Sequence, residues 1–150
     1  MTTAHAAGGA CRACTAVAQA ASLPGGVILD AGGWRLVHNE DTPLPGHLLL
    51  YAVRHVERPA DLTPEEAAAL GGLAARVDAA LRDVLGAGQT YVVSITEGAT
   101  HLHVHFLPIQ PHVPAIGRGV GIFRFLERGE PVEPGRIEEL AARLRAALAT

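Results

Sequence analysis

Histidines and large apolar residues alternate without interruption over residues 101–107. A period of two is typical of a β-strand, and it places His101, His103 and His105 on one face and apolar residues on the other. The apolar face suits a core, whereas three unpartnered imidazoles are costly to bury, so we expect the histidine face to border a site. The outer two Cα atoms of such a strand lie roughly 13 Å apart, which favours separate roles over joint binding of one ion. The alternative is a surface strand that is merely rich in histidine.

Two cysteines near the N-terminus stand in a C-x-x-C spacing, Cys11-Arg12-Ala13-Cys14. Alone, this spacing is compatible with half of a zinc site, with a redox pair or with two unused thiols. A thioredoxin-like redox motif would follow a strand, whereas the small and polar residues 1–10 are expected to be loose chain. The role of the cysteines therefore depends on which other ligands the fold brings to them.

Composition narrows the class of protein. The 150 residues are 49% apolar with a formal charge of −3, which predicts one domain over residues 1–150 and no nucleic-acid partner. All twelve basic residues are arginine, so Schiff-base chemistry and lysine-based phosphate loops are excluded. The longest apolar run, residues 48–53, is too short to span a membrane, and no secretory signal is recognisable. We therefore expect a cytoplasmic protein without a membrane partner, whose cysteines are reduced or bound to metal.

Hydrophobic patterning outlines the strands that position the histidines. Strands are expected at residues 27–30, 34–37, 47–54, 91–95 and 101–107. The first two flank Ala31-Gly32-Gly33, which is typical of a hairpin turn. The short connection over residues 96–100 favours antiparallel pairing of the last two strands. Pro108 is expected to end the histidine strand.

Two helices complete the expected fold. Thr63 is followed by Pro64 and Glu66, which is the pattern of an N-cap with a capping box. Apolar residues then recur every three or four positions up to Gly86, so this long central helix has one apolar stripe. Pro134 opens a C-terminal helix. These elements indicate an α+β fold, with an antiparallel sheet of about five strands.

Three stretches together resemble the histidine triad family. Residues 101–107 meet its H-φ-H-φ-H-φ-φ motif in full, where φ is apolar, and Pro45-Gly46-His47 with the following leucines resembles its P-G-H-x-L-V strand. The stretch Leu62-Thr63-Pro64-Glu65-Glu66 resembles the start of its long helix. The resemblance covers residues 11–109, and residues 110–150 form a C-terminal extension without a family signature.

The resemblance implies a nucleotide hydrolase or nucleotidyltransferase that acts at a phosphorus centre, by phosphoramidate or phosphoanhydride cleavage. By analogy His103 is the nucleophile that forms a covalent intermediate, and His105 donates to the phosphate oxygens as charge develops. No catalytic cofactor is expected. Family members also usually pair as homodimers, and the apolar stripe of the central helix supports that expectation here.

A structural zinc site is the second implication of the resemblance. In zinc-bearing bacterial-type relatives the ligands are two N-terminal cysteines, a histidine after the P-G-H strand and the first triad histidine. The corresponding residues here are Cys11, Cys14, His55 and His101. A Cys₂His₂ set is a closed tetrahedral site. The alternative is that the two cysteines belong to a mobile tail.

The expected nucleotide site departs from the family pattern in two places. Asn39 stands where relatives carry an acid for the ribose diol, and an amide can still hydrogen-bond a hydroxyl. Glu97-Gly98 replaces an asparagine-glycine pair, and Thr100 is the candidate for a missing hydroxyl donor. His47 of the P-G-H turn and His105 complete the expected substrate-binding set. The remaining histidines, His5, His38 and His112, are interpreted as incidental.

Two other classes of function stay open from the sequence. Eight histidines and two cysteines could serve metal storage or regulation. A catalytically inactive triad domain could bind a nucleotide or a protein partner.

Overall fold

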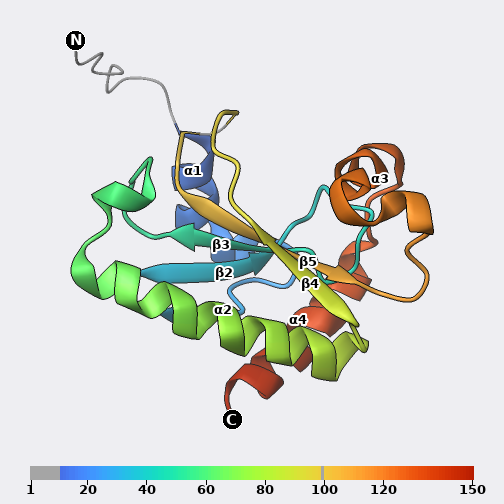
Figure 1. The fold of residues 1–150 in the computed structure, drawn as a ribbon. Helices are drawn as coiled ribbons and strands as arrows, with labels where there is room; N and C mark the ends of the chain where they lie inside the picture. Colours follow the sequence, from blue (N-terminus) through green and yellow to red (C-terminus); the bar gives the residue numbers. More distant parts are fainter. Residues whose placement is uncertain (1–10, 99) are drawn as a thin grey trace.

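The computed structural model describes residues 11–98 and 100–150, so His5 and the expected loose residues 1–10 lie outside the described residues. Five antiparallel strands form one sheet in the order β1-β2-β3-β5-β4 (Figure 1). The strands are β1 (Leu29–Ala31), β2 (Trp34–His38), β3 (Leu48–Ala52), β4 (Gln89–Val93) and β5 (His103–Ile109). The helices are α1 (Arg12–Ala18), α2 (Pro64–Leu85), α3 (Ile122–Arg128) and α4 (Pro134–Leu148). Short 3₁₀ turns lie at Ala20–Ser22, Pro59–Asp61, Ala115–Gly117 and Gly119–Gly121. The α+β prediction is confirmed.

The expected first hairpin is present, with a turn made by two glycines. Gly32 and Gly33 have φ angles of 59° and 82°, the left-handed region that glycine adopts without strain. The hairpin is tied to α2, because Trp34 Nε1–H donates to the carbonyl of Glu66 over 2.9 Å. Gly32 also lies against Ala69 with no room for a side chain.

Helix α2 begins and ends where its sequence signals predict. The Thr63 hydroxyl accepts from the backbone N–H of Glu66, and the Glu66 carboxylate accepts from the N–H of Thr63, which completes a capping box. At the other end Gly86 adopts a left-handed conformation, with a φ of 65°. The described helices include none that is long and apolar enough to cross a bilayer.

The two faces of the sheet have different covers. Helices α2 and α4 pack below the sheet in Figure 1, and α1 lies on the opposite face. The apolar stripe of α2, with Leu73, Val77 and Leu81, is buried in the core of its own chain. The stripe therefore does not indicate a homodimer interface, contrary to the expectation from the sequence, because it already packs within the chain.

Helix α4 closes this layer through hydrogen bonds as well as apolar contacts. Arg76 of α2 donates to the carbonyl of Leu148 over 2.7 Å, and Arg143 of α4 donates to that of Val84 over 2.8 Å. The C-terminal part of the extension beyond residue 109 is thus packed against the central helix.

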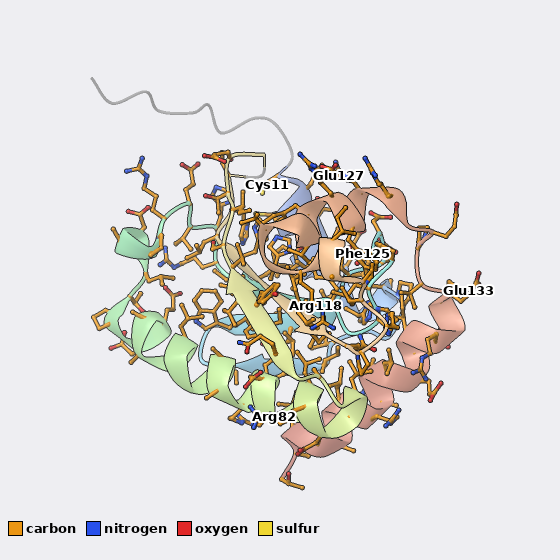
Figure 2. All side chains as sticks on the ribbon, turned by 45° about the vertical axis from the view of Figure 1, so that its right-hand side comes forward. Cys11, Arg82, Arg118, Phe125, Glu127 and Glu133 are labelled. Atoms are coloured by element: carbon orange, nitrogen blue, oxygen red, sulfur yellow. The ribbon has the colours of Figure 1, made fainter. Side chains whose placement is uncertain are left out.

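Strand β5 continues past Pro108 to Ile109, so the expectation that this proline ends it is wrong. Pairing with β3 stops at Phe106, and from there β5 has only β4 beside it. Proline is tolerated at such an edge because the missing N–H breaks no ladder bond. The segment after β5 folds back, and Leu107 and Ile109 pack against a cluster that includes Phe125 of α3. Figure 2 shows Phe125 on α3 and Cys11 at the start of α1.

Candidate functional site

The histidine motif begins two residues before β5 and presents its three imidazoles on the side of α1. Leu102, Val104 and Phe106 are buried in the core on the α2 side. On the other face His101 and His103 are buried, while His105 is half-buried. The alternation therefore places the apolar residues in the core and the histidines on the opposite face, as a period of two predicts.

The hydrogen bonds of His103 select one ring tautomer. Its Nδ1 lies 2.7 Å from the carbonyl oxygen of His101. A carbonyl only accepts, so Nδ1 carries the proton and the neutral ring keeps a lone pair on Nε2. The backbone is held as well, since the Ser94 hydroxyl donates to the carbonyl of His103 over 2.8 Å. The His103 ring is thus fixed with an unprotonated nitrogen available for chemistry.

A chain of hydrogen bonds links His105 to His47. His47 Nε2 and His105 Nδ1 are 2.9 Å apart, and His47 Nδ1 lies 2.8 Å from the Thr42 hydroxyl. The Asn39 amide nitrogen, which can only donate, approaches the same Nδ1 at 3.4 Å. His47 Nδ1 is therefore the acceptor, and its Nε2–H donates to His105. This leaves His105 with a proton on Nε2, so its outer nitrogen is a donor.

Burial keeps both linked imidazoles uncharged. The pKa of His47 is lowered from 6.5 to about 3, first by burial and then by the positive charge that His105 or His38 would carry. The pKa of His105 is lowered from 6.5 to about 4, first by burial and then by the neighbouring His103. At neutral pH the pair therefore offers neutral donors and acceptors.

His38 is a structural residue, so its interpretation as incidental is wrong. It is buried at the end of β2, where its Nδ1–H donates to the Asn39 carbonyl over 2.6 Å. Its Nε2 accepts from the backbone N–H of Gly46 over 2.9 Å. Gly46 has a φ of 82° and lies against Leu85, so glycine is required on both counts. The ring thus clamps the P-G-H turn that presents His47.

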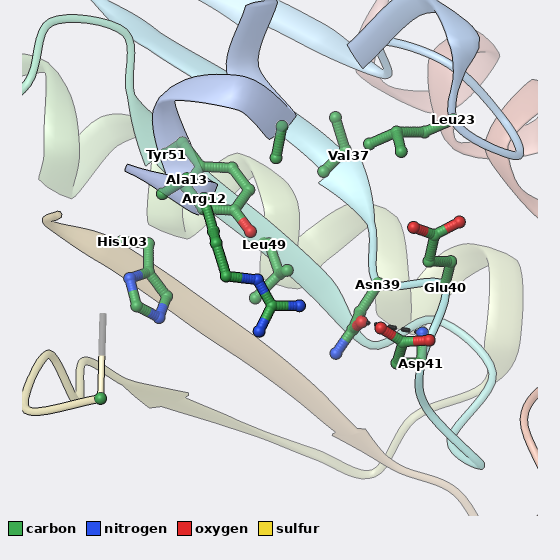
Figure 3. Close-up of a pocket in the computed structure, with 12 residues that line it drawn as sticks. Arg12, Ala13, Leu23, Val37, Asn39, Glu40, Asp41, Leu49, Tyr51 and His103 are labelled. Atoms are coloured by element: carbon green, nitrogen blue, oxygen red, sulfur yellow. Dashed lines mark hydrogen bonds between the residues drawn. The ribbon is translucent and has the colours of Figure 1, made fainter. Parts of the chain in front are cut away.

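A cavity of about 260 Å³ opens between α1, the ends of β2 and β3, and His103 (Figure 3). Apolar side chains from α1, the turn after it and the sheet form part of the wall, while His103 lies at one end and Asn39, Glu40 and Asp41 lie at the other. The lining residues are Arg12, Ala13, Ala16, Leu23, Val37, Asn39, Glu40, Asp41, Leu49, Tyr51, Gly98 and His103.

The expected substrate residues divide into two groups by position. Asn39 and His103 line the cavity, and the His103 and His105 rings are neighbours with centroids 4.9 Å apart. His47 reaches this region through His105. Thr100 is exposed and does not line the cavity, and neither does Glu97. Arg12 and Tyr51 also line the cavity, and neither was expected there from the sequence. The arginine between the two cysteines of the C-x-x-C spacing was the one signal that could have pointed to Arg12.

The four expected zinc ligands come together at the start of α1. One donor atom from each of Cys11, Cys14, His55 and His101 lies within 4.8 Å of the others. Cys14 Sγ lies 3.3 Å from His55 Nδ1 and 3.4 Å from His101 Nδ1. Two thiols and two imidazoles are the donor set of a closed tetrahedral zinc site.

Ring orientation at this cluster also fits a metal. His101 Nε2–H donates to the carbonyl of Ala52 over 2.7 Å, which leaves the lone pair of Nδ1 directed at the sulfurs. Such an outer partner fixes the tautomer of a ligating histidine. His55 presents its Nδ1 to Cys14 Sγ, while its Nε2 lies on the side of the Glu57 carboxylate at 3.7 Å, which is beyond hydrogen-bond distance. The pKa of Cys14 is raised above its ordinary value of 9.0, first by burial and then by Cys11, which is both a hydrogen-bond partner and a negative charge. A bound cation would instead lower the pKa of this thiol.

The family model of the HIT domain matches residues 21–112. The chain belongs to the HIT domain family. This confirms the resemblance to histidine triad proteins. No curated protein sequence matches the chain significantly.

Solved structures with the same fold include other histidine triad proteins. A hypothetical histidine triad nucleotide-binding protein from Sulfolobus tokodaii has a TM-score of 0.70 at 19% identity, over 93% of this chain and 92% of that chain. A zinc-bound histidine triad family protein from Mycobacterium smegmatis has a TM-score of 0.69 at 21% identity, over 93% and 94%. The diadenosine triphosphate hydrolase of Plasmodium falciparum has a TM-score of 0.61 at 16% identity, over 80% and 74%.

Proposed function

We propose that the protein is a nucleotide hydrolase or nucleotidyltransferase that cleaves a phosphoramidate or phosphoanhydride through a covalent adduct on His103. The observation that carries the proposal is the fixed tautomer of His103, whose Nδ1–H is held by a carbonyl beside a cavity of about 260 Å³. The HIT domain and the hydrolase among the structural neighbours support the same class of activity.

In the first step His103 Nε2 attacks the phosphorus atom and forms a P–N bond. The bond from phosphorus to the leaving group breaks, and its electron pair departs with that group. Water or a second acceptor then attacks phosphorus and releases Nε2. A covalent intermediate divides one difficult displacement into two easier ones. The hydrogen bond from Nδ1–H to His101 holds the ring in place through both steps.

His105 would stabilise the charge that develops on the phosphoryl oxygens. Its Nε2–H is the free donor because Nδ1 accepts from His47. A donor that is fixed in advance needs no reorganisation during the reaction. His47 would hold this donor in its tautomer and also border the substrate.

Substrate binding would combine the apolar wall of the cavity with polar groups at its edge. The apolar side chains suit a base, and Asn39, which lines the cavity, would hydrogen-bond a ribose hydroxyl. Thr100 remains a proposed hydroxyl donor that would have to approach from the exposed connection before β5.

A structural zinc ion bound by Cys11, Cys14, His55 and His101 would crosslink α1 to the start of β5. The fit of the donor set and the zinc-bound neighbour support this assignment. Among the described residues this is the single group that could hold a metal, which disfavours the metal-storage alternative. No catalytic cofactor is invoked.

The remaining proposals concern organisation. We propose one HIT-like domain over residues 1–150, in a cytoplasmic protein that forms homodimers and binds neither nucleic acid nor membrane. The family supports the dimer, and Val92, Val120 and Phe123 are exposed apolar residues at the edge strand β4.

The deciding experiment measures turnover of nucleoside phosphoramidates, dinucleoside polyphosphates and nucleotide sugars by wild type, His103→Ala and His105→Ala. His103→Ala should lose turnover and keep the fold. His105→Ala should be slower by about a hundred- to a thousandfold, the usual effect of losing one oxyanion donor. An acid-labile adduct on His103 should appear by mass spectrometry. The exposed His112→Ala is the matched control, and equal rates for His103→Ala and wild type would refute the mechanism.

A further inference from the structure

One arginine side chain points into the cavity that His103 lines. Arg12 is the first residue of α1, and Figure 3 shows its guanidinium group in the middle of the cavity, between the His103 ring and Asn39. It lies between the two cysteines of the C-x-x-C spacing. Two of the four proposed zinc ligands, Cys11 and Cys14, therefore flank Arg12 in the chain.

The position of Arg12 follows from the way α1 is held on the sheet. Ala13 and Val17 are the buried residues of this short helix. Arg35 of β2 donates to the carbonyl of Val17 over 2.8 Å and fixes the far end of the helix. With that face against the sheet, the side chain of Arg12 extends along the cavity.

The charges that line the cavity make this arginine necessary for an anionic ligand. Its other fully charged residues are Glu40 and Asp41, which lie on the far side from His103 (Figure 3). Two carboxylates alone would repel a phosphate group. Arg12 places a cation between them and the nucleophile, and it is the only arginine among the lining residues.

Most other arginines of the chain are already held by partners. Eight such side chains donate to carboxylates or backbone carbonyls, namely Arg35, Arg54, Arg76, Arg82, Arg118, Arg136, Arg143 and Arg145. Arg12 makes no hydrogen bond or ion pair with any residue within the described ranges 11–98 and 100–150. Its five N–H donors are therefore available to a ligand.

We propose that Arg12 binds the phosphate group of the substrate beside His103 and so selects phosphorylated nucleosides over neutral ones. The inference rests on the proposed function for the identity of the site, but it assigns a residue that the HIT motif does not contain. A guanidinium group matches two phosphate oxygens at once, so lysine would replace it only in part.

The test compares binding of AMP and of adenosine to wild type, Arg12→Gln, Arg12→Lys and Arg58→Gln by titration calorimetry. Arg58 is exposed and outside the cavity, so it controls for loss of one positive charge. We expect Arg12→Gln to weaken AMP binding by about ten- to a hundredfold, the usual effect of losing a charge-assisted pair. Adenosine binding should stay unchanged, Arg12→Lys should fall between, and Arg58→Gln should match wild type.

The outcomes separate this inference from the proposed function. Equal AMP affinity in Arg12→Gln and wild type, an equal loss for adenosine, or a wild type that binds no AMP would each overturn the role of Arg12. Turnover that continues unchanged in Arg12→Gln would also overturn it and leave the function standing. Arg12-dependent AMP binding without turnover of any nucleotide substrate would support the inference and remove the proposed enzyme activity.

Discussion

Replacing His47 by glutamine should make the protein less sensitive to acid. His47 is buried, and its pKa in the native protein is about 3 compared with an ordinary value of 6.5. As pH falls below 6.5 the unfolded chain binds a proton at this residue, whereas the native protein does not. The unfolded state then binds more protons, so the free energy of unfolding decreases as pH falls.

The size of the effect follows from the two pKa values. Each pH unit over which only the unfolded state is protonated costs about 1.4 kcal/mol of stability. Between pH 6.5 and about pH 4.5 the unfolded state becomes fully protonated at this site, which amounts to a loss of about 2 kcal/mol. His105 adds a loss of the same sign, because its pKa is lowered to about 4.

Urea unfolding at several pH values measures this loss, and the fluorescence of the buried Trp34, the single tryptophan, reports the transition. His47→Gln should lose about 2 kcal/mol less than wild type between pH 6.5 and about pH 4.5. Its amide can still donate to His105, so the fold should persist. The exposed His112→Gln should keep the pH dependence of wild type. An equal loss in His47→Gln and wild type would show that native His47 takes up its proton at an ordinary pKa.

Two further predictions concern the metal and the assembly. The purified protein should contain about one zinc per chain by elemental analysis, and Cys11→Ala/Cys14→Ala should contain none and melt at a lower temperature, because metal binding is linked to folding. Zinc retained by that variant would refute the assignment. Sedimentation at tens of micromolar should give a homodimer, and Val92→Asp should dissociate it if the exposed edge strand is the interface. A monomeric wild type would contradict the proposed assembly.

Local signals in the sequence predicted much of the fold. The period of two over residues 101–107 assigned both faces of β5, because alternation has one structural solution in a strand. The capping pattern at Thr63 predicted the start of α2, and the glycines at 86 and 88 predicted its end, which the structure has at Leu85 with Gly86 as the cap. Such signals succeed because the interaction that creates the structure lies within a few positions along the chain.

The features that sequence reading missed depend on contacts between distant residues. Helix α1 is only seven residues long, and burial of Ala13 and Val17 against the sheet holds it rather than helix propensity. His38 acquires its role only when the loop brings Gly46 back to its ring. Arg12 becomes a site residue because α1 crosses the histidine face. None of these contacts produces a periodic pattern of residues in the sequence.

Asn39, the clearest departure from the family pattern, is consistent with an intact site. Its amide oxygen accepts from the backbone N–H of Asp41 over 3.0 Å, so its nitrogen is turned toward His47. The Asn39 amide and the Thr42 hydroxyl can therefore both donate to His47 Nδ1, which keeps this nitrogen as an acceptor. An aspartate would present an acceptor there and favour the opposite tautomer, which would point the His47–His105 hydrogen bond the other way. The amide therefore supports the arrangement in which the outer nitrogen of His105 is a donor, the state that a developing phosphoryl charge requires.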